Sequence, residues 1–120
     1  MLGRLVNLVG KGFWPHNGPN VSVVVPLGAT QAAAAGIGDA DVVVTSGGTA
    51  TTADGVRLAK PQKGDIVFVR HPGAYTLDVW PAKGDKINGG STDAVYTGVT
   101  TGKCCLLVAI SDTEWAAMVG

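Results

Sequence analysis

The sequence predicts an all-β fold: a small antiparallel β-sandwich or barrel-like domain with an irregular N-terminal arm. Short apolar runs alternate along the chain with turns rich in glycine, of which there are 18. Valine, threonine and alanine dominate the remainder, and this mixture favours strands and tight turns over helices. We expect the arm to comprise residues 1–30 and the β domain to comprise residues 31–120.

Length and charge narrow the class of protein. The chain has 120 residues, enough for one core, and its nine basic and nine acidic residues give no net charge. Nucleic-acid binders cluster basic residues on one surface, so we expect no nucleic-acid partner. No stretch approaches the roughly 20 apolar residues of a membrane span, and Asn7 interrupts the only run that resembles a signal-peptide core. We therefore expect a soluble protein made in the cytoplasm, with no membrane partner.

The predicted arm is the least regular part of the chain. Leu2, Leu5, Val6 and Val9 would share one face of a short helix, but residues 5–9 fit a strand equally well. Prolines and turn residues exclude a regular element from residues 13–20. Such an arm either docks on a neighbouring chain or folds back on its own core, and both interpretations stay open.

The next segment alternates strands and turns. Apolar β-branched runs bounded by proline or glycine predict strands over residues 21–25, 41–45 and 55–59. The alanine run 32–35 favours a helix, but Gly36 follows at once, so we expect at most one or two helical turns.

Residues 65–80 predict the clearest hairpin in the sequence. The strand 65–70 alternates its apolar side chains between two faces, and the turn 71–74 contains a proline-glycine pair. The strand 75–80 then returns with Leu77 and Val79 inward. We expect these two strands to pair with each other.

The last third of the chain predicts a weak strand over residues 93–99, followed by two strong ones. Residues 104–110 are apolar at every position, and a strand that is apolar on both faces must be covered on both. We expect this strand to lie centrally or beneath a neighbouring subunit. After a tight turn, the closing strand 114–119 places Trp115 on its apolar face.

The cysteines and histidines do not form a recognisable catalytic motif. Cys104 and Cys105 are adjacent in a predicted strand, so their side chains point to opposite faces and an ordinary disulfide between them is disfavoured. We expect reduced thiols packed as small hydrophobic groups. A triad of either cysteine with His71 and with Asp78 or Asp85 has no local motif in its favour, so we expect no enzyme.

No cofactor or metal ion is expected either. The glycine pairs lack the sequence of a phosphate loop, and the scattered acidic residues lack EF-hand spacing; a single structural calcium ion in a loop remains an alternative. Lys-Gly-Asp occurs at residues 63–65 and again at 83–85. This repetition predicts one turn used twice, in which glycine adopts a positive φ and aspartate makes an Asx-type hydrogen bond.

Three tryptophans are the large anchors of the chain. Each is more typical of core or subunit-interface packing than of a carbohydrate platform, and Trp14, in the irregular arm, is the one we favour for contact with another chain. The candidate residues for contact with a capsid or with another subunit are Leu2, Leu5, Val6, Phe13, Trp14, His16, Trp80 and Trp115.

A distinctive string follows the predicted hairpin. Trp80 is followed by PAKGDKING over residues 81–89, then by a glycine turn at Gly102, an apolar strand and the closing residues 113–115. In this pattern the segment 64–115 resembles small structural proteins of tailed bacteriophages, namely the capsid decoration (cement) or head-fibre proteins. Residues 1–30 lie outside the resemblance.

The resemblance implies a function. Decoration proteins of this kind are commonly small, β-rich homotrimers that bind the major capsid protein on the outer surface of the virion and tie neighbouring shell subunits together. It implies assembly in the host cytoplasm, with the major capsid protein and other copies of the chain as partners. A second hypothesis is a tail fibre, spike or other module that binds a host receptor or glycan.

Overall fold

Ten strands and no helix make up the described part of the chain. The computed structural model describes residues 19–47 and 54–120, and within these ranges the predicted all-β class is confirmed. The strands are β1 (Val21–Val24), β2 (Ala35–Gly36), β3 (Val42–Thr45), β4 (Gly55–Arg57), β5 (Ile66–Arg70), β6 (Leu77–Trp80), β7 (Lys86–Ile87), β8 (Tyr96–Val99), β9 (Cys104–Ala109) and β10 (Glu114–Val119).

The strands form two mixed sheets. Sheet A has the order β1-β3-β5-β9-β10-β7, and sheet B has the order β2-β4-β6-β8. The expectation of an antiparallel fold is wrong for much of the molecule, because β1–β3, β3–β5, β2–β4, β4–β6 and β7–β10 are all parallel pairs. The antiparallel pairs are β5–β9, β9–β10 and β6–β8.

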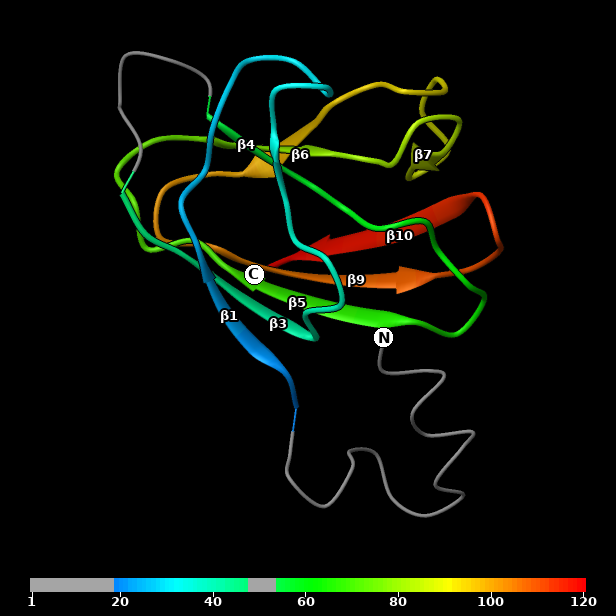
Figure 1. Cartoon of the computed structure of the whole chain (residues 1–120), viewed down its shortest axis with the longest axis horizontal. Helices are drawn as coiled ribbons and strands as arrows, with labels where there is room; N and C mark the ends of the chain where they lie inside the picture. The colour runs from blue at the N-terminus through cyan, green and yellow to red at the C-terminus, as the bar shows by residue number, and fades with distance from the viewer. Residues whose placement is uncertain (1–18, 48–53) are drawn as a thin grey trace.

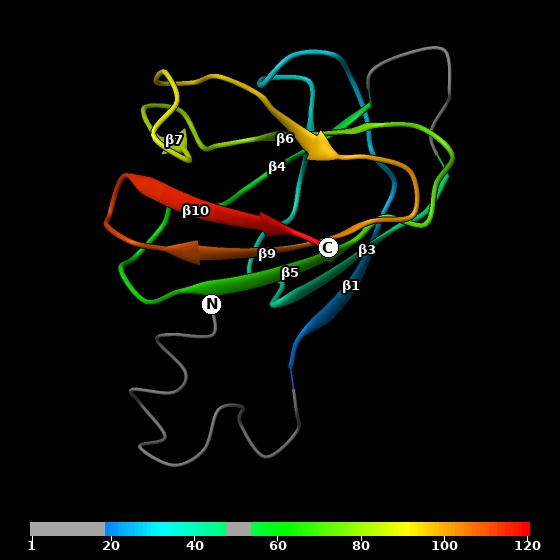
Figure 2. The same cartoon turned by 180° about the vertical axis from the view of Figure 1, so that it is seen from behind.

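The parallel pairs arise because the first six strands wind as a coil. Strands alternate between the sheets, so that β1, β3 and β5 stack in sheet A while β2, β4 and β6 stack in sheet B. Figures 1 and 2 show the two layers from opposite sides, with β1, β3, β5, β9 and β10 side by side in one of them. Strands β8 to β10 then add antiparallel partners and close the coil at one end.

The predicted hairpin over residues 65–80 is wrong. Both strands exist, as β5 and β6, but they lie in different sheets, and β5 pairs with β3 and β9 instead. His71 explains the difference. Its ring is fully buried, and it bonds to Thr45 on one side and to the carbonyl of Tyr75 on the other, so the turn leaves the plane of sheet A.

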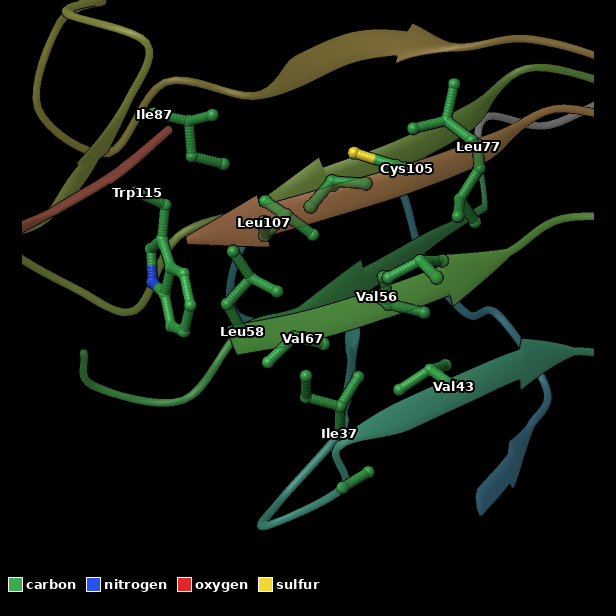
Figure 3. Packing of buried hydrophobic residues seen from close by; sticks show 14 of the residues in the cluster. Ile37, Val43, Val56, Leu58, Val67, Leu77, Ile87, Cys105, Leu107 and Trp115 are labelled. Atoms are coloured by element: carbon green, nitrogen blue, oxygen red, sulfur yellow. The ribbon is translucent and has the colours of Figure 1, made fainter. Parts of the chain in front are cut away.

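The core lies between the two sheets, where inward-facing residues of both meet. Val43, Val67 and Leu107 come from sheet A, and Val56 and Leu77 come from sheet B; all five are buried. Figure 3 shows these side chains converging, with Trp115 and Ile87 at one end of the cluster. Burial of one such side chain contributes about 1.5–3 kcal/mol to folding.

The repeated Lys-Gly-Asp turn occurs twice, as predicted. Each copy lies where the chain crosses from sheet B to sheet A, and Gly64 and Gly84 have φ values of 94° and 91°. In the first copy, the Asp65 carboxylate accepts the main-chain N–H of Gln62 at 2.9 Å. This bond runs back three residues along the chain, so it is not the predicted Asx-type bond, which would reach the N–H two residues further on. In the second, the buried carboxylate of Asp85 pairs with the Lys60 ammonium group.

Candidate interaction surface

The side of sheet A that faces away from sheet B is apolar across five strands. Period-2 alternation sends every second side chain of a strand to this side, and runs such as VVVT and CCLLVA place apolar residues on both sides. We call this side the outer face. It consists of Val21 and Val23 of β1, Val42 and Val44 of β3, Ile66 and Phe68 of β5, Cys104, Leu106 and Val108 of β9, and Ala116 and Met118 of β10.

The strand register aligns these residues in rows. One row crosses all five strands as Val21, Val42, Phe68, Leu106 and Met118, each opposite the next. Directly opposed side chains in neighbouring strands are in contact distance. The outer face is therefore one continuous apolar patch.

Solvent reaches much of the outer face in the described structure. Val23 is 71% exposed, Met118 is 63% exposed and Val21 is 57% exposed. Phe68 in the central strand β5 is also exposed, and the other residues of the face are half-buried. Arg70 is an exposed charge on this side, opposite Val44 and Cys104. At the far end, Glu114 pairs with Lys86 at 3.7 Å. The largest exposed apolar patch of a monomeric protein is often a functional surface.

The two cysteines lie on opposite faces, as predicted. Cys104 is half-buried on the outer face, Cys105 is fully buried in the core, and both are free thiols. Burial raises the pKa of the Cys105 thiol to about 11, with a smaller contribution from the neighbouring Cys104. Cys105 therefore stays protonated at neutral pH and packs as a small hydrophobic group.

The side chain of His71 has a structural role. Its Nε2 lies 2.6 Å from the carbonyl oxygen of Tyr75, which can only accept a hydrogen bond, so Nε2 carries the proton. Nδ1 lies 2.7 Å from the hydroxyl oxygen of Thr45, within hydrogen-bond distance. The ring also packs edge-on against Tyr75, with centroids 4.7 Å apart. Both ring nitrogens are thus engaged in holding the crossing between the sheets.

Acidic residues gather at one place in sheet B, but they do not form a metal site. Burial raises the pKa of Asp78, and the charge of Asp54 raises it further; the same two causes, in the same order, raise the pKa of the Tyr75 hydroxyl. Within residues 19–47 and 54–120, no three histidine, cysteine or acidic side chains lie close enough to hold a metal ion.

Two shallow pockets flank Arg57, with volumes of about 400 Å³ and about 260 Å³. The guanidinium group donates to the main-chain carbonyls of Gln31, at 2.9 Å, and of Ala32 and Ala34, at 3.3 Å. Arg57 thus fixes the loop before β2.

The predicted contact residues divide into three groups. Leu2, Leu5, Val6, Phe13, Trp14 and His16 lie outside the described residues. Trp115 is fully buried, so it packs in the core, which is one of the two roles expected for it. Trp80 is half-buried and lies over Gly55, where an added Cβ would come within 3.0 Å of its ring.

The outer face as a whole escaped the sequence analysis, which identified only the doubly apolar run 104–110. The same signal is present in residues 42–44 and 66–69, which are also apolar at every position. Strand β9 does lie centrally in sheet A, as predicted, between β5 and β10.

No family model matches the chain, and no curated protein matches its sequence. Within the described ranges, no helix has the length and apolar character needed to cross a membrane.

Proposed function

We propose that the chain is a structural virion protein that decorates and stabilises a bacteriophage capsid. The single observation that supports this proposal most is the outer face of sheet A, an apolar surface that solvent reaches across five strands. The resemblance of residues 64–115 to decoration and head-fibre proteins suggests the particle. In this proposal the two facing sheets act as a small β-sandwich, and the outer face docks across seams between shell subunits.

The mechanism is mechanical. Apolar surface buried across a seam is lost when the seam opens, so docking raises the free energy needed to rupture the shell as packaged DNA presses outward. The described chain suits such a role because a buried core keeps sheet A rigid while its outer face stays available.

The outer face contributes to docking without sufficing for it. Five strands about 4.8 Å apart and about 15 Å long give a footprint on the order of 400 Å². At about 25 cal/mol per Å², its burial contributes on the order of 10 kcal/mol, and the costs of association are of similar size. Retention therefore needs several linked contacts, which together bind far more tightly than each does alone.

A charge on the outer face tests the proposal. Met118→Lys places an ammonium group on an exposed position of that face, and Thr97→Lys places the same group on an exposed position of sheet B. We expect Met118→Lys to lower occupancy on shells of the major capsid protein by about tenfold or more, because a buried unpaired charge costs well over 1.4 kcal/mol. Thr97→Lys should bind as the unaltered chain does.

Co-sedimentation with purified shells measures occupancy, and circular dichroism verifies that both variants fold. Equal occupancy of the two variants would contradict docking through the outer face. Quantitative mass spectrometry of virions then counts the copies per particle. Hundreds of copies support shell decoration, whereas a handful would favour a tail or vertex protein.

A further inference from the structure

Strand β1 is an open edge of sheet A. Within the described residues, β1 pairs only with β3, and nothing pairs with its other side. The direction of its main-chain groups follows from three hydrogen bonds: the carbonyl of Asn20 accepts Asp41 N and Val42 N, and the carbonyl of Val24 accepts Ser46 N. The N–H and C=O groups of the even-numbered residues therefore point toward β3. Those of Val21 and Val23 point away from it, toward the open edge.

The other three sheet edges are protected in ways that β1 is not. Strands β2 and β7 have only two residues each, and the pairing of β8 with β6 is irregular at Leu77 and Val79. Short edges and bulges discourage the addition of another strand. Strand β1 has four residues, with neither a charge nor a proline among them. The two residues whose main-chain groups point away from β3, Val21 and Val23, are also exposed.

We propose that β1 pairs antiparallel with β1 of a second copy of this chain, about a two-fold axis normal to sheet A. An antiparallel pair centred on any one residue matches odd-numbered residues with odd-numbered residues. The outward main-chain groups of Val21 and Val23 then always meet their equivalents in the other copy, which makes the edge self-complementary.

The pairing leaves both outer faces uncovered, and the relevance of their area rests on the proposed docking to a shell. A two-fold axis normal to the sheet keeps both outer faces on the same side, so two footprints of about 400 Å² each become one of about 800 Å². That area is close to what one partner of a stable interface buries. The pair thus presents a surface of the required size, whereas one copy presents about half of it. The proposed assembly is thus a two-fold pair, whereas the resemblance implies a homotrimer.

Amide hydrogen exchange on the full chain tests the pairing in solution, without any shell. Across a concentration series, the amides of Val21 and Val23 should become protected in step with a doubling of the mass measured by light scattering. The amides of Ser22 and Val24 face β3 and serve as an internal control, protected at every concentration. Rapid exchange of Val21 and Val23 in a chain that stays monomeric would overturn the proposal, and so would a trimeric mass.

A proline variant gives a second test. Val23→Pro removes an N–H that makes no bond to β3, so the domain should fold, while dimerisation weakens about thirtyfold because the pair loses two main-chain hydrogen bonds. Val23→Thr keeps the N–H and the branched shape, and it should dimerise nearly as well. Protection of Val21 and Val23 in a chain whose mass stays monomeric would show that residues of the same chain occupy the edge, and this too would overturn the proposal. None of these outcomes alters the test of shell docking.

Discussion

Leu106 and Leu107 are neighbours in β9, yet they have opposite surroundings. Leu107 points into the core and is fully buried, whereas Leu106 lies on the outer face between Phe68 and Met118 and is half-buried. The two residues are of the same type and lie in the same strand, between the same two flanking strands. Only the face differs, and so the pair separates what holds the fold together from what remains available to a partner.

The contrast extends over the whole of sheet A. Its inner face is covered by sheet B, while its outer face is equally apolar but has no cover among the described residues. Parallel sheets are normally covered on both sides, and the β1–β3–β5 segment is parallel. The inner face supplies the core of the fold, and the outer face is the surface through which we propose that the chain docks.

Truncation of each leucine should give the largest difference between the faces. Leu107→Ala leaves a cavity in the core and should lower the free energy of unfolding by about 2–5 kcal/mol. Leu106→Ala should cost less than about 1 kcal/mol in the free protein, because a half-buried surface side chain loses few contacts. Urea unfolding of both variants measures the two values. Equal losses would mean that the outer face is covered in the free protein.

The adjacent cysteines test the same contrast through reactivity. At pH 8, iodoacetamide should modify Cys104 at least about 100-fold faster than Cys105, because the raised pKa of Cys105, about 11, leaves little thiolate and the core excludes the reagent. Peptide mass spectrometry over a time course measures both rates. In urea the two rates should converge. Faster modification of Cys105 in the folded chain would require β9 to be shifted by one residue, which exchanges its faces.

Much of this contrast could be predicted from the sequence. Alternation within residues 65–70 predicted that Val67 and Val69 share a face opposite Phe68, and the structure confirms it. The run 104–110 predicted a central strand in need of cover on two sides, because no polar residue marks a solvent face. Period-2 patterning is a local property, so it can be read without knowledge of the partner strands.

Strand pairing could not be predicted in the same way. A proline-glycine turn after Arg70 is compatible both with a hairpin and with a crossing between sheets, since the two begin with the same local geometry. Contacts of His71 with Thr45 and Tyr75 decide between them, and the first of these joins residues far apart in sequence. The parallel coil, and with it the extent of the outer face, depends on such contacts.

The smallest predicted effect is a change in melting temperature from a buried acidic residue of sheet B. Because burial and the charge of Asp54 raise the pKa of Asp78 above its ordinary 3.8, the folded state binds the proton more tightly than the unfolded state does. The stability that this group contributes is therefore full below pH 3.8 and is lost as the pH rises through the folded-state pKa. Asp78→Asn should raise the melting temperature slightly at pH 7, and the gain should vanish at low pH.

Asp93→Asn is the matched control of opposite sign. The pKa of Asp93 lies below its ordinary value because the Gln31 side chain and the Gly84 N–H donate to the carboxylate, so this group stabilises the fold above pH 3.8 and loses that effect as the pH falls through its folded-state pKa. Asp93→Asn should therefore lower the melting temperature at pH 7. Thermal unfolding of both variants between pH 3 and pH 7 measures the two slopes. Slopes of the same sign would refute the view that burial destabilises the ionised carboxylate of Asp78. Asp78 would then behave as a solvated surface group, and sheet B would differ in this from both faces of sheet A.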